Sequence, residues 1–453
     1  MDKRKIVKIC LVLFAISAGV RLLVWQNNKL VIEEPQWVLA DIYKLDARLL
    51  VAGDLKTFLT GNDPPSDTTI IMHPPGYPIF LASVYSLFGE TDVFRVVQIL
   101  FNSLAPVIIF LTGLILLDYR TAIISSLLAI FLPQSAYYAA TPLPDGLSVV
   151  PILFALYIFS LNLRRGSLVL TAMCGAALGV SCWLRSNAML LPVFFIFFGA
   201  ILWPKGTRVR QSLTLFLAFV FVIAPLTIRN FVVFHAFVPI SSAGGHNFIA
   251  GLADYDAEGK FGLSVLDVDA AKQEAEMYGR PDYGVSQYSP DGIPREKDRY
   301  RRGIKIVIEN PVWYFRSVIH RALTYSLRFE RVPVIAPGRD ERANTIPILY
   351  ILNIPLKAFQ RLFITAILTP LMLGGIIILF RRKEKRKVLL VLLIVPVYYA
   401  CIQSLLHTEY RYVLPATHVV IMFSAVALSY LLGMVLKLLA KTPDTNNPQI
   451  NAD

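Results

Sequence analysis

Long apolar segments recur along most of the chain, separated by short breaks that are charged or rich in proline and glycine. A helix needs about 20 mostly apolar residues to cross the hydrocarbon core of a bilayer. Segments of this kind occur ten times, at residues 7–25, 95–117, 121–138, 145–163, 167–184, 187–203, 211–228, 361–380, 388–406 and 412–436. The pattern predicts an all-α integral membrane protein with about ten transmembrane helices.

The composition supports the same class. Of the 453 residues, 55% are hydrophobic and 17% are charged, and the mean hydropathy is +0.57. These values exclude a soluble globular protein of this size. Cys10, Cys174, Cys182 and Cys401 lie within apolar segments rather than in loops, so we expect neither a disulfide nor a zinc site.

The net charge of +13 is better explained by membrane orientation than by a nucleic-acid partner, because Lys and Arg are retained on the cytoplasmic side during insertion. Basic residues precede the first span and recur in every second loop, as in the segment 381–387. With ten spans this parity places both termini in the cytoplasm, in a multi-pass protein of the plasma (inner) membrane. It also argues against a cleaved signal peptide at residues 1–25.

Two large segments, residues 26–94 and 229–360, then fall on the outer face. We expect four parts: a transmembrane module at 1–228, an outer segment at 229–360, a three-span module at 361–440 and a disordered tail at 441–453. The outer segment is rich in loops at first. Its later part has helical periodicity with interleaved basic residues, which is typical of helices that lie in the membrane interface.

Away from their ends, the predicted spans after the first contain no Asp, Glu or Lys. Carriers that couple transport to ions usually hold ionisable groups near the bilayer midplane. Here such groups collect in the outer loops and at the outer ends of the helices. Any chemistry is therefore expected at the outer face.

Three outer features contain candidate residues. The helical stretch 33–54 includes Asp41, the rigid turn HPPGYP at 73–78 includes His73 and Tyr77, and the turn TPLPDG places Asp145 at the head of the fourth predicted span. Two prolines would hold the HPPGYP turn in place. From spacing alone, Asp41 also fits a solvated charge on an interfacial helix, and Asp145 also fits a helix-capping carboxylate.

Taken together, the order and spacing of these motifs resemble the polytopic GT-C glycosyltransferases, in particular the protein O-mannosyltransferases and the lipid A aminoarabinose transferases. The resemblance covers nearly the whole chain. It rests on Tyr43, Ala47, Arg48, Gly53, the HPPGYP turn, the Asp145 turn and the segments 229–251, 308–329 and 409–420.

This resemblance implies a GT-C-like fold and an enzyme that moves a hexose or pentose from a polyprenyl-phosphate carrier to a protein, lipid or glycan acceptor, with inversion. Asp41 would be the general base. In the family the first-loop acid stands about four residues before the aromatic that matches Tyr43, where this chain has Leu39. Another register matches Glu33 and Glu34, so Glu34 is the reserve.

The resemblance also implies substrate-binding roles on the outer face. Asp145 resembles a second acid that orients the acceptor or the donor sugar. Cations and hydrogen-bond donors would stabilise the leaving phosphate. The candidates are His73, Tyr77, Arg185, Arg229, His246, Asn247 and Arg411. A divalent cation is compatible with this chemistry, although the sequence contains no ligand set with recognisable spacing and we assign no metal site.

Two other classes share part of the pattern. A transporter or flippase of lipid-linked sugars would have the same hydropathy and basic cytoplasmic loops, but the acid-free helices and the large first outer loop count against it. A non-catalytic subunit of a cell-envelope complex is the other alternative. Neither predicts that changing Asp41 to an amide abolishes a product while the protein still folds.

Overall fold

The structure, a computed structural model, describes residues 2–27, 37–63, 67–256, 258–264, 266–326 and 367–439, together with residues 351, 354, 355 and 358. This part of the chain forms helices and loops and contains no β-strand.

The N-terminal half contains α1 (Lys3–Asn27), α3 (Trp37–Val51), α4 (Leu55–Thr60), η1 (Thr69–Ile71), α5 (Gly76–Phe88), α6 (Val93–Asn102), α7 (Leu104–Leu116), α8 (Tyr119–Ile130), α9 (Pro133–Ala140), α10 (Asp145–Arg165), α11 (Leu168–Leu184), η2 (Ser186–Ala188), α12 (Leu191–Leu202), η3 (Lys205–Thr207) and α13 (Arg208–Phe234). The C-terminal half contains α14 (Gly244–Ala253), α15 (Asp267–Tyr278), η4 (Pro281–Gly284), α16 (Gly292–Glu309), α17 (Pro311–Arg321), η5 (Ala322–Ser326), α20 (Leu368–Arg381), η7 (Lys383–Lys385), α21 (Arg386–Ile402), η8 (Gln403–Leu405) and α22 (Leu414–Leu439).

Six helical segments among the described residues are long and apolar enough to cross a membrane: Lys3–Gln26, Val93–Leu116, Asp145–Arg165, Lys205–Phe234, Lys383–Leu405 and Leu414–Leu439. The pair α8 and α9 would make a seventh, but its two helices are bent by 52° at their junction. Leu132, between them, has an extended backbone, because the following Pro133 disfavours the helical conformation of the residue before it.

Three other predicted spans are helical but short. They correspond to Leu168–Leu184, Ser186–Leu202 and Leu368–Arg381, and residues 361–366 lie outside the described residues. The multi-pass, all-helical class is therefore confirmed for the described residues. The count of ten crossings is not, since six or seven segments satisfy the length and composition of a span.

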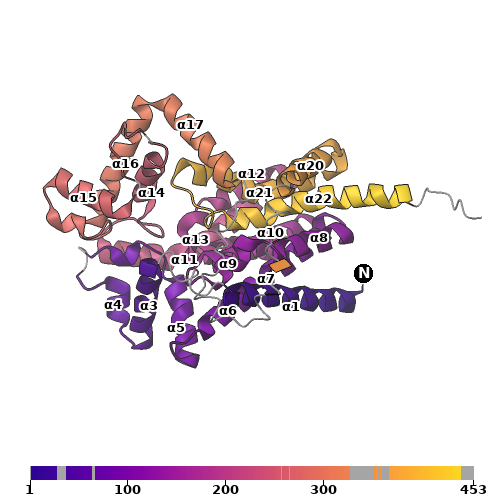
Figure 1. The fold of residues 1–453 in the computed structure, drawn as a ribbon, viewed down its shortest axis with the longest axis horizontal. Helices are drawn as coiled ribbons and strands as arrows, with labels where there is room; N and C mark the ends of the chain where they lie inside the picture. Colours follow the sequence, from indigo (N-terminus) through magenta and orange to yellow (C-terminus); the bar gives the residue numbers. More distant parts are fainter. Residues whose placement is uncertain are drawn as a thin grey trace, which may run out of the picture.

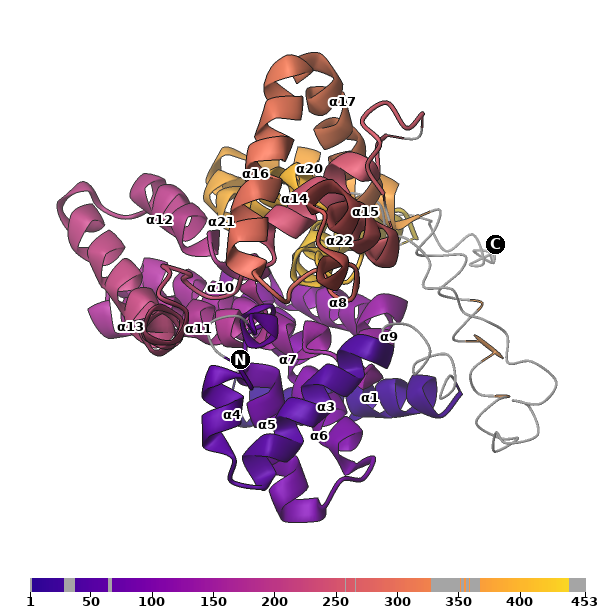
Figure 2. The same ribbon diagram turned by 90° about the vertical axis from the view of Figure 1, so that its left-hand side faces the viewer.

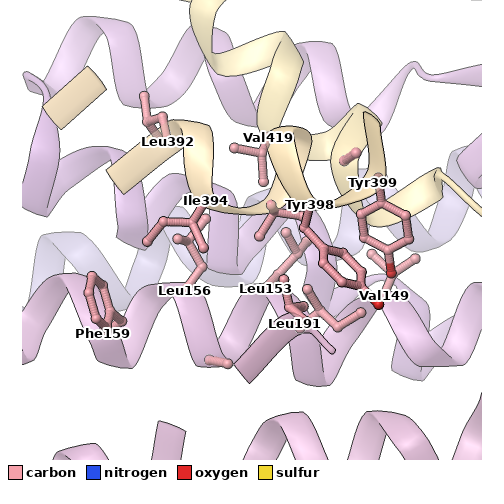
Figure 3. Packing of buried hydrophobic residues seen from close by; sticks show 14 of the residues in the cluster. Val149, Leu153, Leu156, Phe159, Leu191, Leu392, Ile394, Tyr398, Tyr399 and Val419 are labelled. Atoms are coloured by element: carbon pink, nitrogen blue, oxygen red, sulfur yellow. The ribbon is translucent and has the colours of Figure 1, made fainter. Parts of the chain in front are cut away.

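The core of the membrane part is built around α10, which is buried on nearly all sides. Figure 3 shows its side chains facing those of α21, α12 and α22. The labelled residues are Val149, Leu153, Leu156 and Phe159 on α10, Leu191 on α12, Leu392, Ile394, Tyr398 and Tyr399 on α21, and Val419 on α22. Because lipid tails are as apolar as these side chains, close packing rather than hydrophobic transfer holds such helices together.

Glycines let two helix pairs approach closely. A Cβ atom on Gly175 of α11 would collide with the backbone of Leu215 on α13, and one on Gly375 of α20 would collide with the backbone of Phe423 on α22. Small residues at such crossings are typical of membrane helices. All four cysteines are free thiols.

Helices from the two predicted outer segments gather at one end of the molecule. In Figure 1, α1 begins and α22 ends on the right, whereas α3, α4 and α14–α16 lie on the left. Figure 2 looks at that left-hand end and shows α3–α5 on one side and α14–α17 on the other. Helices α3 and α4 of the first segment and α14–α16 of the second thus lie toward the same end of the molecule. That this end is extracytoplasmic remains a prediction from the charge distribution.

Candidate active site

A cavity of about 1280 Å3 lies where the outer segments meet the helix ends. One wall comes from the start of α3 and the loop before α5. A second wall comes from the turn after α11, and a third from residues 398–412. Another side is covered by α14, α15 and α16, which we call the roof, and residues between 235 and 243 also line the cavity. Residues on all of these segments line the cavity.

Asp145 and Arg185 form a buried ion pair next to this cavity. The Asp145 carboxylate stands on the first residue of α10 and Arg185 follows the end of α11. Asp145 Oδ1 lies 2.6 Å from Arg185 Nη1, and the Asp145 side chain is fully buried. A carboxylate removed from water needs such a counter-charge. Arg185 lines the cavity, so the pair fixes a guanidinium at its wall.

The aromatic ring of Tyr412 connects this pair to a second charged cluster. The guanidinium carbon of Arg185 lies 4.3 Å from the centre of that ring, and the guanidinium carbon of Arg411 lies 5.2 Å from it. Cations are attracted to aromatic faces at such distances. Tyr412 and Arg411 also line the cavity.

The second cluster centres on Glu409. Its carboxylate accepts a hydrogen bond from Arg411 Nη2 at 2.8 Å and one from the Tyr412 hydroxyl at 3.2 Å, and Arg411 Nε lies 2.8 Å from its other oxygen. His407 Nε2 lies 3.4 Å from the carboxylate, and His407 Nδ1 contacts Asp254.

The two carboxylates set the charge of His407. Burial alone would lower the pKa of its imidazole, but the hydrogen bonds to Asp254 and Glu409 outweigh it and raise that pKa to about 9. In turn, although burial opposes the change, His407 and Arg411 lower the pKa of Glu409 to about 2. His407 is therefore cationic at neutral pH and adds its charge to those of the guanidinium groups beside it.

His73 lies in the cavity wall, as the sequence suggested, but as a neutral group. Burial, followed by the positive charges of Arg185 and Arg411, lowers the pKa of His73 to about 3. Its ring centre lies 5.5 Å from that of Tyr43, which meets Tyr77 edge to face at 5.2 Å. Tyr77 is buried against Tyr43 and does not line the cavity.

His246 and Asn247 begin the roof at the first turn of α14, and both line the cavity. The Glu296 carboxylate of α16 accepts hydrogen bonds from the backbone N–H groups of Gly245, at 2.6 Å, and His246, at 3.0 Å. This bonding satisfies donors that a helix N-terminus leaves free. The side chain of His246 lies 3.5 Å from Asp267 Oδ1.

Buried charges make the roof rigid. Glu274 of α15 accepts hydrogen bonds from Arg295, Arg299 and Arg302 of α16. Arg299 also donates to Glu296 at 2.6 Å, so the same network that joins α15 to α16 orients the carboxylate under α14.

A polar face of α6, whose residues were not among the sequence candidates, holds the Asp145 turn. Gln98 Nε2 donates to the carbonyls of Ala139 and Thr141, and Asn102 Nδ2 donates to the carbonyl of Gly146 at 2.7 Å. The turn is thus bonded on both sides of Asp145. The spacing of three and four residues that places Arg95, Gln98 and Asn102 on one helix face was the available signal.

The orientation of these two amides is fixed by their other partners. Arg21 can only donate hydrogen bonds, so its Nε donates to Oδ1 of Asn102 at 2.7 Å. Nδ2 of Asn102 is therefore the atom that donates to the Gly146 carbonyl. Because Nε2 of Gln98 donates to carbonyls, its Oε1 is left to accept a hydrogen bond, which the Tyr77 hydroxyl donates at 2.9 Å. Gln98 in this way links the HPPGYP turn to the Asp145 turn.

The structure does not bring Asp41 to this cavity. Asp41 is two residues from Tyr43, which is about 200° around a helix, and Tyr43 faces the cavity. Asp41 instead lines a separate pocket of about 360 Å3, with 61% of its side chain exposed and Lys44 Nζ 3.6 Å away. Glu34 lies outside the described residues.

Arg229 also lies outside the cavity lining. It stands near the outer end of α13 and faces Asp46 of α3. Burial raises the pKa of Asp46 to about 6, and the charge of Arg229 partly offsets that rise. Of the seven predicted binding residues, five line the cavity: His73, Arg185, His246, Asn247 and Arg411.

Several residues that line the cavity, and Asp254 beside His407, were missed from the sequence. His407 and Glu409 stand in the same HTEYR turn as Arg411, so their spacing alone could have identified them. Asp254 and Asp267 stand in polar parts of the outer segment where no local pattern distinguishes one acid from another. Among the described residues, no group of three or more His, Cys, Asp or Glu side chains is arranged to hold a metal ion.

Residues 72–228 match the family model of the dolichyl-phosphate-mannose-protein mannosyltransferases. No curated protein sequence matches the chain. Among solved structures, the apo oligosaccharyltransferase of Archaeoglobus fulgidus is similar over 95% of this chain and 51% of its own, with 14% identity and a TM-score of 0.51. The chain thus spans about half the length of that protein.

A second similar structure is ArnT from Cupriavidus metallidurans bound to undecaprenyl phosphate, with 14% identity and a TM-score of 0.36 over 98% of this chain and 81% of that one. The apo state of the same ArnT gives 15% identity and a TM-score of 0.34. The family match at residues 72–228 and the fold similarity to the oligosaccharyltransferase confirm the resemblance of this chain to the GT-C glycosyltransferases.

Proposed function

We propose that the protein is an inverting glycosyltransferase that moves a sugar from a polyprenyl-phosphate-linked donor to an acceptor on the extracytoplasmic side of the membrane. The observation that carries this proposal is the convergence of Arg185, Arg411 and His407 on one cavity at the ends of apolar helices. The family match supports it, since the description of that family names dolichyl-phosphate-mannose, a sugar carried on a lipid phosphate.

The donor has an apolar tail and an anionic head, and the cavity offers surfaces for both. Met189, Leu190 and Phe237 line it and remain exposed, as a tail that enters from the lipid requires. The cations stand deeper, next to Tyr412 and Asp145. As the bond to the sugar breaks, negative charge grows on the phosphate, and donors already in place stabilise it.

Attack by the acceptor hydroxyl requires a base that reaches the cavity. We assign this role to His246, with Asp267 as its orienting partner. Asp267 is 75% exposed in the cavity lining, and its hydrogen bond with His246 lowers the pKa of its carboxyl. The carboxylate therefore stays ionised and stabilises the imidazolium that forms when His246 takes the proton. This assignment replaces Asp41, which faces the other pocket.

The proposed reaction forms one bond to the anomeric carbon and breaks another. The acceptor oxygen forms a bond to the anomeric carbon from the side opposite the phosphate, the carbon–oxygen bond to the phosphate breaks, and the phosphate leaves with the electron pair. His246 receives the hydroxyl proton. His73 is neutral at physiological pH, so it acts as a hydrogen-bond partner at the wall rather than as a charge.

The test is transfer of a radiolabelled sugar from a small panel of synthetic polyprenyl-phosphate donors by the purified protein in lipid. We expect Arg185→Gln and Arg411→Gln to lower transfer by about 10²-fold or more. Arg165→Gln, at the exposed opposite end of α10, is the matched control and should not. If the wild-type protein consumes no donor but moves labelled lipid across the bilayer, the enzyme proposal fails and a flippase takes its place.

A further inference from the structure

The carboxylate of Glu409 lies among several hydrogen-bond donors, and such a group of donors also suits other anions. Arg411 approaches both of its oxygens, with Nη2 at 2.8 Å from one and Nε at 2.8 Å from the other. The Tyr412 hydroxyl donates to the carboxylate at 3.2 Å, and His407 Nε2 lies 3.4 Å away. A guanidinium grouped with further donors around one anion is an arrangement that proteins use for carboxylates and for phosphates alike.

The charges around this point already cancel. The cations are Arg185, Arg411 and His407, and each has an acid beside it: Asp145 for Arg185, Glu409 for Arg411, and Asp254 for His407. An incoming phosphate would gain little from a neutral cluster. It gains most if one of the three acids gives up its place, because the cations then face the phosphate alone.

Glu409 is the acid that can move. The side chain of Asp145 is fully buried, and that of Asp254 is 18% exposed. That of Glu409 is 34% exposed and lines the cavity. Glu409 also stands in the irregular turn between η8 and α22, so its side chain can rotate toward cavity water without disturbing a helix.

The surrounding donors would stay in place during such a rotation. The backbone N–H of His407 donates to the carbonyl of Asn247 at 2.7 Å, and the His407 ring keeps its contact with Asp254. Arg411 remains stacked on Tyr412. Among the described residues, Nε and Nη1 of Arg411 are buried without a hydrogen-bond partner, although Nε lies 2.8 Å from Glu409, so the carboxylate leaves two donors of this guanidinium for a phosphate.

We propose that Glu409 is an internal competitor for the phosphate-binding position, and that the phosphate of a lipid-linked donor binds by displacing its carboxylate from Arg411. This inference rests on the proposed function and adds a specificity-determining residue to it. Displacing Glu409 has a cost that only a strongly charged headgroup repays, so substitution of Glu409 changes the binding of a phosphate-bearing lipid and not that of a neutral one. In the opposite view Glu409 orients Arg411 throughout, and its removal would weaken phosphate binding.

The two views predict opposite changes in the affinity for a lipid phosphate when Glu409 is substituted. This affinity is measured in a binding experiment rather than by sugar transfer. The purified full chain in nanodiscs is titrated with undecaprenyl phosphate and with undecaprenol, the neutral analogue. We expect Glu409→Gln to bind undecaprenyl phosphate at least about tenfold more tightly than wild type, as expected when one nearby like charge is removed. Binding of undecaprenol should be unchanged.

Glu276→Gln is the matched control, because Glu276 is exposed on α15, away from the cavity lining, and the substitution changes the net charge equally. Glu409→Ala serves if the amide variant fails to fold. Competition by inorganic phosphate, and by vesicles of phosphatidylglycerol, separates recognition of the phosphate group itself from recognition of a membrane headgroup.

Equal or weaker binding of undecaprenyl phosphate by the Glu409 variants overturns the proposal, and so does a lack of binding by every variant. If Glu409→Gln binds undecaprenyl phosphate more tightly than wild type but the wild type transfers no sugar, the displacement of Glu409 is supported and the glycosyltransferase proposal is rejected. The two proposals therefore fail separately.

Discussion

Asp145 and Arg185 are joined across the outer ends of α10 and α11 by an ion pair of 2.6 Å, with the carboxylate fully buried and the guanidinium at the cavity wall. Removing one member of a buried pair leaves the other charge without compensation, which typically costs about 3–5 kcal/mol. We therefore expect Asp145→Asn to lower the unfolding temperature as well as transfer. Thermal unfolding in detergent measures the first effect.

The double variant Asp145→Asn with Arg185→Gln is the comparison for that result. It removes both charges, so its unfolding temperature should lie above that of Asp145→Asn alone, while its transfer stays low. If the losses in unfolding temperature of the two single variants simply add in the double variant, Asp145 and Arg185 are not energetically coupled, contrary to what their geometry indicates.

Asn102 provides a test of how the Asp145 turn is positioned. Asn102→Asp keeps an acceptor for Arg21 but replaces the donor to the Gly146 carbonyl with a second acceptor. We expect the turn to loosen and transfer to fall by about tenfold or more. Faster hydrogen exchange of residues 139–148 would report the loosening even without an activity assay.

Asn162→Asp is the control for this prediction. Asn162 is also buried and lies near the C-terminal end of α10, the helix that begins at Asp145, where it donates to Thr171 at 2.7 Å. The same chemical change should therefore carry a similar stability cost without altering exchange at 139–148. If both variants lose transfer equally, Asn102 is only a structural residue.

The acids of the outer segments can be ranked by one set of amide substitutions. Asp267→Asn should lower kcat by about 10²-fold, because His246 would lose its orienting partner. Asp41→Asn should lower it much less, because Asp41 lines the other pocket. Glu34→Gln belongs in the same set, as the reserve acid from the sequence. A large loss confined to Asp41→Asn would restore the assignment made from the family resemblance.

Much of the fold could be predicted because bilayer crossing imposes a length and an apolar composition. The predicted span 145–163 is observed as Asp145–Arg165, and 412–436 as Leu414–Leu439. The span 121–138 is broken by Pro133, whose effect on the preceding residue was visible but was outweighed by hydropathy. Helix existence follows from composition, whereas bending depends on single residues.

The site was less predictable, because it depends on which helix face turns inward. Asp41 and Tyr43 are close in sequence but point to different pockets. Arg185 and Arg411 are far apart in sequence but face the same ring of Tyr412. The partners of His407 come from two segments, and only packing brings Asp254 to it. A motif can place a residue at the outer face, but it does not show which cavity that residue lines.

The charge of His407 should make the site sensitive to high pH. Its pKa rises from 6.5 to about 9 on folding, so the folded state holds the proton more tightly. This contribution to stability is fully present below about pH 6.5 and is lost as the pH rises through about 9. Binding of undecaprenyl phosphate should weaken over the same alkaline range, because the loss of one cation leaves Arg185 and Arg411 to hold the headgroup.

Asp254→Asn is the variant that tests this account, because it removes the carboxylate in contact with His407 Nδ1. The alkaline decline in both unfolding temperature and lipid binding should then begin at a lower pH. Asp269→Asn, an exposed acid that pairs with Lys272 at 3.7 Å, should leave the decline where it is. An unchanged profile in Asp254→Asn would show that another group titrates in this range, since His407 cannot keep its raised pKa after losing the stronger of its two carboxylate partners.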